Sequence, residues 1–232
     1  WIARTRGDGN CFYRAFAFLL LNYVFVNKAA PNHNCITQAI LRLKLEERWA
    51  NVLRSESNQS NGAVHLDNVW NELRGCLQQF MVSMEQFDRL ENEAQLVQFI
   101  NDPSHSQRVV AFLRMATALE MMEKRDDFAP YTMQLDPNIL HYVLTRVLSM
   151  DQEAEQMEIT ALASFLTGST MLAEFNRSVN VTILYLDGNP RDMQEYSYCI
   201  NQKPAAEDAQ EISSPREHMY LLYRSGHYDA LL

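Results

Sequence analysis

A cysteine preceded by two glycines is the first feature of this 232-residue chain whose residue types suggest chemistry. The segment reads Gly7-Asp8-Gly9-Asn10-Cys11 and leads directly into an apolar run. Two glycines around an aspartate allow a tight turn, and asparagine is a good helix cap, so Cys11 is expected in the first turn of a helix. The positive end of the helix dipole favours a thiolate, and backbone N–H groups of the turn can bind an oxyanion beside the sulfur. The segment therefore predicts a nucleophile, although a buried, inert cysteine at the start of a core helix fits the same residues.

A histidine near the other end of the chain could act as the base for this cysteine. Ser225-Gly226-His227-Tyr228-Asp229 follow a predicted strand, and residues two apart on a strand project to the same face. Asp229 could hold Nδ1–H of the imidazole and leave Nε2 to take a proton from a thiol. A His-x-Asp pair is a weak motif by itself. The other five histidines, however, lack a comparable neighbouring turn and carboxylate.

The elements that must position these residues divide the chain into a helical part and a strand part. Apolar residues at helical spacing predict helices over 35–54, 66–82, 104–123 and 155–166. Another helix runs to about 148, with Asp136 as its cap and Pro137 at its first position. β-Branched and apolar runs predict strands over 179–186, 195–200 and 218–224, with a solvated loop over 201–217.

Composition favours one α+β domain and excludes several function classes. Apolar residues make up 47% of the chain, enough for a real core, and seven glycines with seven prolines are few for an all-β fold. The net charge of −9 disfavours nucleic acid as a partner. The longest apolar run, Ala15 to Leu21, is far shorter than the ~18 residues of a membrane helix.

Cysteine usage and the N-terminal residues indicate an intracellular protein. The four cysteines, at 11, 35, 76 and 199, lie too far apart for a zinc knuckle or a redox pair, so reduced thiols and no metal are expected. A secretory signal fits poorly, because Asp8 and Arg14 crowd the apolar run and Asn27 and Lys28 disrupt a small-residue cleavage site. Because the chain begins with Trp1 and not Met, we expect it to be a piece of a longer protein.

Both ends of the chain resemble the motifs of one protein family. Residues 8–16 (DGNCFYRAF) and 220–229 (YLLYRSGHYD) are similar to the nucleophile and histidine motifs of ovarian-tumour-domain (OTU) cysteine proteases, specifically otubains. Residues 158–163 (EITALA), leading through a strand to residues 185–187 (YLD), resemble the family's middle segment. The resemblance implies an α+β, papain-like fold of OTU type, with the helical N-terminal two thirds packed on a small C-terminal sheet. It also implies a single catalytic domain over 1–232 with a helical subdomain at about 31–125.

The resemblance further implies a deubiquitinating cysteine protease, which hydrolyses isopeptide bonds after the C-terminal glycine of ubiquitin in chains or conjugates. Cys11 would be the nucleophile, His227 the general base and then acid, and Asp229 the residue that orients the imidazole. Asp8 would shape the oxyanion loop. No cofactor is implied. Ubiquitin, polyubiquitin chains and E2 conjugating enzymes are the expected partners, without nucleic acid or membrane, in the cytoplasm or nucleus.

Two departures from the otubain pattern limit what the resemblance implies. Ser225 stands where otubains usually have proline, which could loosen the loop that positions His227. Residues 24–150 match the family only in helical character and length, so the preferred ubiquitin linkage does not follow. Two alternatives stay open: a non-catalytic protein that binds ubiquitin or an E2 enzyme, and a hydrolase for a ubiquitin-like modifier or another acyl compound.

Overall fold

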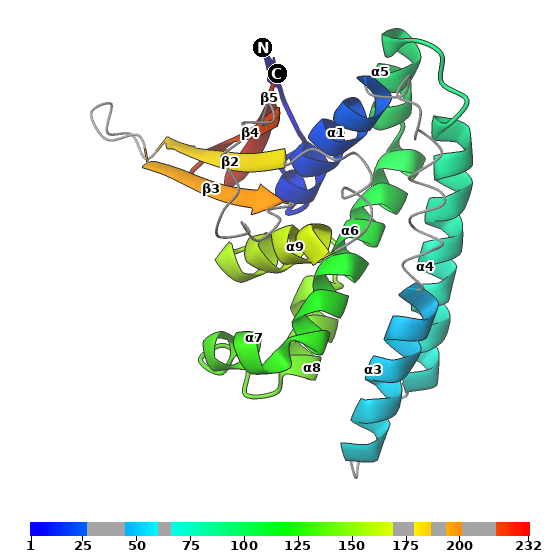
Figure 1. The fold of residues 1–232 in the computed structure, drawn as a ribbon, viewed down its shortest axis with the longest axis vertical. Coiled ribbons are helices and arrows are strands. Elements are labelled where there is room, and N and C mark those ends of the chain that lie inside the picture. Colours follow the sequence, from blue (N-terminus) through cyan, green and yellow to red (C-terminus); the bar gives the residue numbers. More distant parts are fainter. Residues whose placement is uncertain (27–44, 60–65, 169–178, 187–193, 201–216) are drawn as a thin grey trace, which may run out of the picture. The chain divides into compact units, whose positions relative to one another are not determined.

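The computed structural model describes residues 1–26, 45–59, 66–168, 179–186, 194–200 and 217–232 (Figure 1). The chain divides into two compact units. One consists of residues 1–35 and 151–232, and the other of residues 36–150. The first unit contains every described strand, and the described elements of the second are all helices. That the whole chain acts as one catalytic domain stays a prediction.

The first unit is built on a mixed five-stranded sheet. Its strand order is β1-β5-β4-β2-β3, in which β2 and β4 are parallel and the other neighbours are antiparallel. The three predicted strands are confirmed, with β3 and β4 beginning one residue earlier than expected. The strands are β1 (Ile2–Ala3), β2 (Val179–Leu186), β3 (Gln194–Ile200), β4 (Glu217–Arg224) and β5 (His227–Leu231).

Two helices cover this sheet. Helix α1 (Cys11–Val26) contacts β5 and β4, and α9 (Gln156–Gly168) contacts β3. The centres of β2 and β4 are buried on both faces: Ile183 and Leu221 are fully buried, and their neighbours Thr182 and Leu222 are buried as well. Helix α1 buries residues on all sides, because its sequence is apolar nearly throughout. The candidate nucleophile therefore begins a central helix of this unit.

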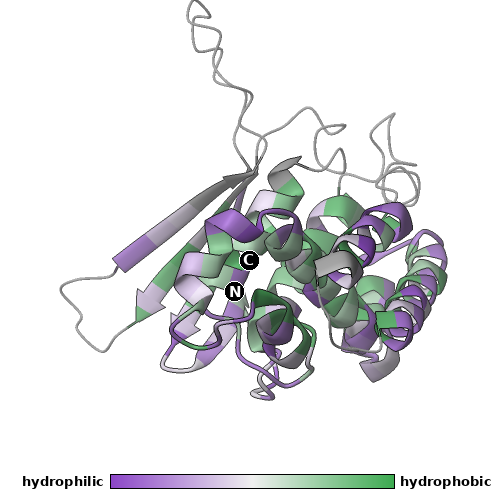
Figure 2. Cartoon of the chain, turned by 90° about the horizontal axis from the view of Figure 1, so that it is seen from below, coloured by the Kyte–Doolittle hydropathy of each residue, from purple (hydrophilic) through white to green (hydrophobic). Residues whose placement is uncertain are grey.

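The second unit is a bundle arranged around α6. Helix α6 contacts α3, α4, α5, α7 and the π-helix η2, and its Phe112 stacks on Phe80 of α4 with ring centroids 3.8 Å apart. Figure 2 shows that the helices carry hydrophilic as well as hydrophobic residues, as amphipathic packing requires. The elements are α3 (Leu45–Gln59), α4 (Leu66–Phe87), α5 (Glu93–Asn101), α6 (Pro103–Glu123), α7 (Arg125–Thr132), α8 (Ile139–Tyr142) and η2 (Val143–Val147).

Two of the predicted helices end later than the sequence indicated. Helix α4 continues to Phe87 because Met84 and Phe87 extend its buried stripe. Helix α3 continues past its expected end at residue 54, through a polar run, and ends at Gln59. In that run Glu56 is buried and accepts a hydrogen bond from Arg125 at 2.7 Å, so a tertiary ion pair stabilises the extra turn. Residues 35–44 of the predicted helix, and residues 201–216 of the predicted loop, lie outside the described residues.

The predicted cap of the helix before residue 148 was wrong by two residues. Asn138 is the N-cap, and its side chain accepts hydrogen bonds from the N–H groups of Leu140 and His141. Asp136 instead accepts a hydrogen bond from the Asn138 N–H at 2.9 Å and contacts the His141 ring. Pro137 therefore lies before the cap and not inside the helix. The predicted helices over 104–123 and 155–166 are confirmed within two residues.

No helix in the described ranges is both long and apolar enough to span a bilayer.

Candidate active site

Cys11 occupies the first position of α1, as the sequence predicted, and is 3% exposed. The Asn10 carbonyl accepts a hydrogen bond from the Arg14 N–H at 2.9 Å, which makes Asn10 the residue before the first helical turn. Its side chain, however, forms two hydrogen bonds with Asp151. The expected capping residue thus lies in place, but its amide links the turn to a distant segment.

The pKa of the Cys11 thiol is raised above its ordinary value. Burial is the largest cause, and the Glu153 carboxylate acts in the same direction. Backbone hydrogen bonds from Tyr228 and Phe12 to the sulfur lower the pKa but do not outweigh burial. The backbone N–H groups at the helix start thus favour the thiolate, as expected, but burial outweighs them, so Cys11 needs a base to remove its proton.

His227 begins strand β5 and lies beside Asp229 on the same face, as the period of two predicted. Its Nε2 is 2.9 Å from Oδ1 of Asp229. Nδ1 lies 3.8 Å from the position that a Cβ on Gly7 would take. The sequence led us to expect Nδ1 at Asp229 and Nε2 toward the thiol. In the structure Nε2 meets the carboxylate instead, so the expected roles of the two nitrogens are reversed. Nδ1 is the nitrogen that faces the segment leading to Cys11.

Asp229 is fully buried and accepts hydrogen bonds from three directions. Oδ1 accepts from the backbone N–H of Thr5 at 2.9 Å as well as from His227, and Oδ2 pairs with Arg224. Burial alone would raise the pKa of this carboxyl, but the hydrogen bonds from Thr5, His227 and Arg224 together hold it below its usual value. Asp229 is therefore ionised at neutral pH and fixes the imidazole ring.

Tyr228 connects this pair to the cysteine. Its ring packs edge-on against Phe12 of α1 with centroids 5.4 Å apart, and its backbone N–H bonds the Cys11 sulfur. The sulfur therefore lies next to the residue that follows His227. The contact of α1 with β5 thus places Cys11 next to the strand that carries His227 and Asp229, although the two motifs lie at opposite ends of the chain.

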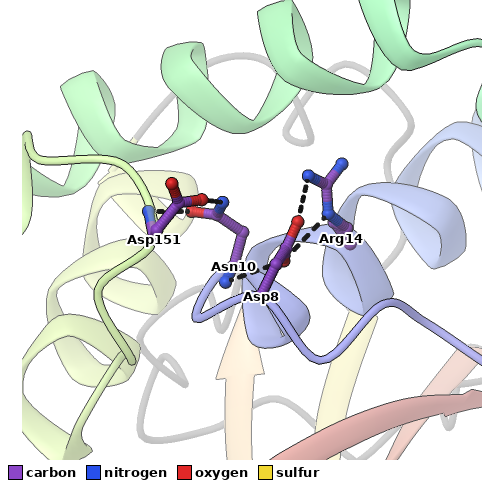
Figure 3. Close-up of polar contacts among 4 residues, drawn as sticks. All are labelled: Asp8, Asn10, Arg14 and Asp151. Atoms are coloured by element: carbon purple, nitrogen blue, oxygen red, sulfur yellow. Dashed lines mark hydrogen bonds and ion pairs between the residues drawn. The ribbon is translucent and has the colours of Figure 1, made fainter.

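The turn before Cys11 is held by Asp8. Oδ1 of Asp8 accepts the Asn10 N–H at 3.2 Å, and its Oδ2 lies 2.6 Å from Nη2 of Arg14 (Figure 3). Although burial acts to raise the pKa of Asp8, Arg14 and the Asn10 N–H lower it overall. Asp8 thus shapes the turn from within. Its bond to the Asn10 N–H also occupies one of the backbone donors expected to face an oxyanion.

Sequence reasoning missed three residues at this site: Thr5, Asp151 and Arg224. Arg224 lies opposite His227 in the β4–β5 pair, so the hairpin register could have indicated it. Thr5 and Asp151 contact the site only through the tertiary fold, and no local pattern marks them. In the described part of the chain, no group of three His, Cys, Asp or Glu side chains could hold a metal ion.

A cysteine at a helix N-terminus beside a histidine–carboxylate pair on a strand is the arrangement of papain-like cysteine peptidases. The family model described as Peptidase C65 Otubain matches residues 1–232, and the chain belongs to this family. The predicted family is confirmed.

Curated relatives match nearly the whole chain at modest identity. The Arabidopsis thaliana OVARIAN TUMOR DOMAIN-containing deubiquitinating enzyme 1 is 27% identical over 242 residues, covering 99% of this chain and 69% of the relative. Mouse ubiquitin thioesterase OTUB2 is 27% identical over 230 residues, covering 99% and 80%. Human ubiquitin thioesterase OTUB1 is 26% identical over 234 residues, covering 100% and 70%.

Solved structures confirm the fold class. The chain is similar to the structure of h/ceOTUB1-ubiquitin aldehyde-UBC13~Ub, with a TM-score of 0.68 and 18% identity, covering 100% of this chain and 77% of that one. A second likeness is to h/ceOTUB1-ubiquitin aldehyde-UBCH5B~Ub, with a TM-score of 0.57 and 19% identity, covering 100% and 75%.

Proposed function

We propose that this otubain is a thiol-dependent deubiquitinase, which hydrolyses the bond after the C-terminal glycine of ubiquitin in chains or conjugates. One observation carries the proposal: the backbone of Tyr228 hydrogen-bonds to Cys11, and the residue before Tyr228 is His227, whose ring a buried carboxylate orients. Relatives named ubiquitin thioesterases and a deubiquitinating enzyme support the choice of substrate.

The chemistry is acyl transfer through a thioester. Nδ1 of His227 takes the Cys11 proton, and the thiolate attacks the carbonyl carbon of the ubiquitin C-terminal glycine. The Cys11 N–H, one of the first helical N–H groups without an intrahelical acceptor, stabilises the oxyanion. His227 then protonates the departing lysine amine. In the second half, His227 activates water, which hydrolyses the thioester and restores the thiol.

Each supporting side chain has a defined part in this sequence. Asp229 accepts the Nε2–H of His227, so Nδ1 keeps its lone pair toward the thiol and the imidazolium is stabilised when it forms. Asp8 holds the turn that carries the oxyanion donors through its contacts with Arg14 and Asn10. Because the pKa of Cys11 is raised, the proton transfer to His227 is required for attack.

Ubiquitin, polyubiquitin and E2 conjugating enzymes are the partners that we infer. Similar structures contain ubiquitin aldehyde and ubiquitin-linked UBC13 or UBCH5B. The net charge of −9 suits a basic partner surface. Action on ubiquitin conjugates places the protein in the cytoplasm or the nucleus, with residues 1–232 acting as one catalytic domain.

Reaction with a ubiquitin that carries a thiol-reactive C-terminus tests the proposal. We expect a covalent adduct with the wild-type chain, no adduct with Cys11→Ala, and an undiminished adduct with Cys76→Ala. Cys76 is the matched control because it is a half-buried thiol in α4, where burial raises its pKa to about 11. Diubiquitin cleavage should likewise be lost in Cys11→Ala and tolerate replacement of Cys35, Cys76 and Cys199.

The two alternative functions give different outcomes in this experiment. A non-catalytic binder would retain ubiquitin without forming an adduct. A protease for a ubiquitin-like modifier would react with a probe built on that modifier and not with the ubiquitin probe. Full diubiquitin cleavage by folded Cys11→Ala would refute the proposed nucleophile.

A further inference from the structure

Asp151 lies against the two residues that precede the candidate nucleophile, although 141 positions separate it from Asn10. Nδ2 of Asn10 donates to Oδ1 of Asp151 at 2.7 Å, and the Asp151 N–H donates to Oδ1 of Asn10 at 3.1 Å (Figure 3). Asn10 is fully buried. The paired bonds fix both the position and the rotation of the Asn10 amide, next to Cys11 in the chain.

The backbone of Asp151 also packs on Gly9. A Cβ added to Gly9 would lie 2.2 Å from the carbonyl oxygen of Asp151, and Gly9 has a φ of +73°. Asp151 itself has a φ of +64°, and it is the only non-glycine residue with positive φ in the described ranges. Aspartate tolerates this conformation better than most residues, but it still requires support from its surroundings. The bonds to Asn10 supply that support.

The turn before Cys11 is therefore held by residues of its own segment on one side and by a residue distant in sequence on the other. Asp8 and Arg14 belong to the same segment as Cys11 and hold the turn from within. Asp151 enters from a distant part of the chain, at the first residue of this unit after the helical unit ends at residue 150. Without its carboxylate, the Asn10 amide loses this hydrogen bond, and the hold on the Gly9–Asn10 backbone is weakened.

From these contacts we propose that Asp151 is a positioning residue for the reaction, which holds the Gly9–Asn10 turn so that Cys11 and its N–H meet the substrate carbonyl. This inference rests on the proposed hydrolase function. Asp151 touches neither the substrate nor the sulfur, and it acts through Asn10. A displacement of about 1 Å at reacting atoms can cost about 100-fold in rate, so its removal should reduce kcat and leave KM nearly unchanged.

Three substitutions separate the hydrogen bond from backbone strain. Asp151→Asn keeps an oxygen acceptor for Asn10 and tolerates positive φ. Asp151→Ala removes the acceptor and adds strain, whereas Asp151→Gly removes the acceptor and relieves strain. With a fluorogenic ubiquitin substrate, we expect kcat to fall about 10- to 100-fold in the Ala and Gly variants, with KM within about twofold. The Asn variant should stay within about threefold of wild type in kcat.

The rate of Cys11 alkylation by iodoacetamide across pH gives a second measure that needs no substrate. Glu153 is the carboxylate whose charge acts on the pKa of Cys11. Asp151→Asn removes only the charge of Asp151 and should therefore leave the alkylation profile unchanged. The Ala and Gly variants also lose the bond to Asn10 and should shift the profile. Ala and Gly variants that are folded by their thermal transitions, yet match wild type in kcat and alkylation, would overturn the inference. So would an Asn variant as impaired as Asp151→Gly. If the wild type cleaves no ubiquitin substrate, the proposed function fails, and the alkylation profiles alone decide the role of Asp151.

Discussion

Replacing Asp229 by asparagine should preserve most of the activity that alanine removes. Oδ1 of Asp229 accepts both the Thr5 N–H and His227 Nε2, each at 2.9 Å, while Oδ2 faces Arg224. An asparagine with its oxygen at the Oδ1 position keeps the first two bonds. The pairing with Arg224 is lost, and that half-exposed side chain can turn to water. The negative charge that stabilises the imidazolium is lost as well, which accounts for the remaining loss of rate.

The expected magnitudes follow from these contacts. Asp229→Ala leaves the Thr5 N–H without its acceptor, which costs about 1–3 kcal/mol of folding free energy. For a chain of this length, each kcal/mol lowers Tm by about 2–4 °C. The freed imidazole should reduce kcat about 10- to 100-fold. Loss of the base itself in His227→Ala should cost about 10²- to 10⁴-fold, and Asp229→Asn should stay within about tenfold of wild type.

The assay is steady-state hydrolysis of a fluorogenic ubiquitin substrate, at a temperature well below the lowest Tm of the set. Thermal unfolding of each variant separates lost catalysis from lost folding. An asparagine variant as inactive as the alanine variant would refute the reasoning from Oδ1. Full activity of Asp229→Ala would mean that another group orients His227, and full activity of the double variant would refute the pair.

The same carboxylate predicts a pH dependence of stability. Because the folded-state pKa of Asp229 lies below the ordinary value of 3.8, its ionisation stabilises the fold above the unfolded-state pKa. That contribution is lost as pH falls through the folded pKa. The difference in unfolding free energy between wild type and Asp229→Asn should therefore be present at pH 5 and shrink below about pH 4. Chemical denaturation at several pH values measures it, and a difference that persists unchanged at the lowest pH would contradict the prediction.

Three further predictions concern the turns and the helical surface. Gly9→Ala should cost about 1–3 kcal/mol and most activity, because its Cβ meets the Asp151 carbonyl at 2.2 Å; Gly75→Ala in α4, where a Cβ meets nothing within 4 Å, should stabilise by up to about 1 kcal/mol. Equal thermal shifts in these two variants would contradict the steric argument. Ser225→Pro should stabilise the folded protein by about 0.4–1 kcal/mol. Gly226 has a φ of +76°, and proline is favoured at the turn position just before such a residue, which Ser225 occupies. A lower denaturation midpoint would contradict this prediction. Charge reversal at the exposed α4 residues Glu72, Arg74 and Glu85 should raise KM for diubiquitin and leave KM for a monoubiquitin substrate unchanged. Unchanged diubiquitin kinetics would mean that this helical surface does not bind the second ubiquitin.

The sequence predicted most elements whose signal is local. Helix α6 and strand β2 follow from the spacing of their apolar residues, and Cys11 was placed at a helix start by the residues just before it. The helix and strand periods depend only on neighbouring residues, so these predictions needed no tertiary information. The weaker predictions were element ends. Helix α3 extends beyond its polar boundary because Glu56 meets Arg125, 69 positions away.

At the site, the sequence by itself determined the residue types and their order, and the tertiary structure decided how they act. Cys11, His227 and Asp229 could be named from two motifs at opposite ends of the chain. Burial then reversed the expected direction of the Cys11 pKa, because desolvation depends on everything packed around the thiol. The side of the His227 ring that meets Asp229, and the contact of Asp151 with Asn10, likewise depend on packing between segments far apart in sequence. No local pattern encodes such contacts, since they form only when α1, β5 and the segment around Asp151 fold against one another.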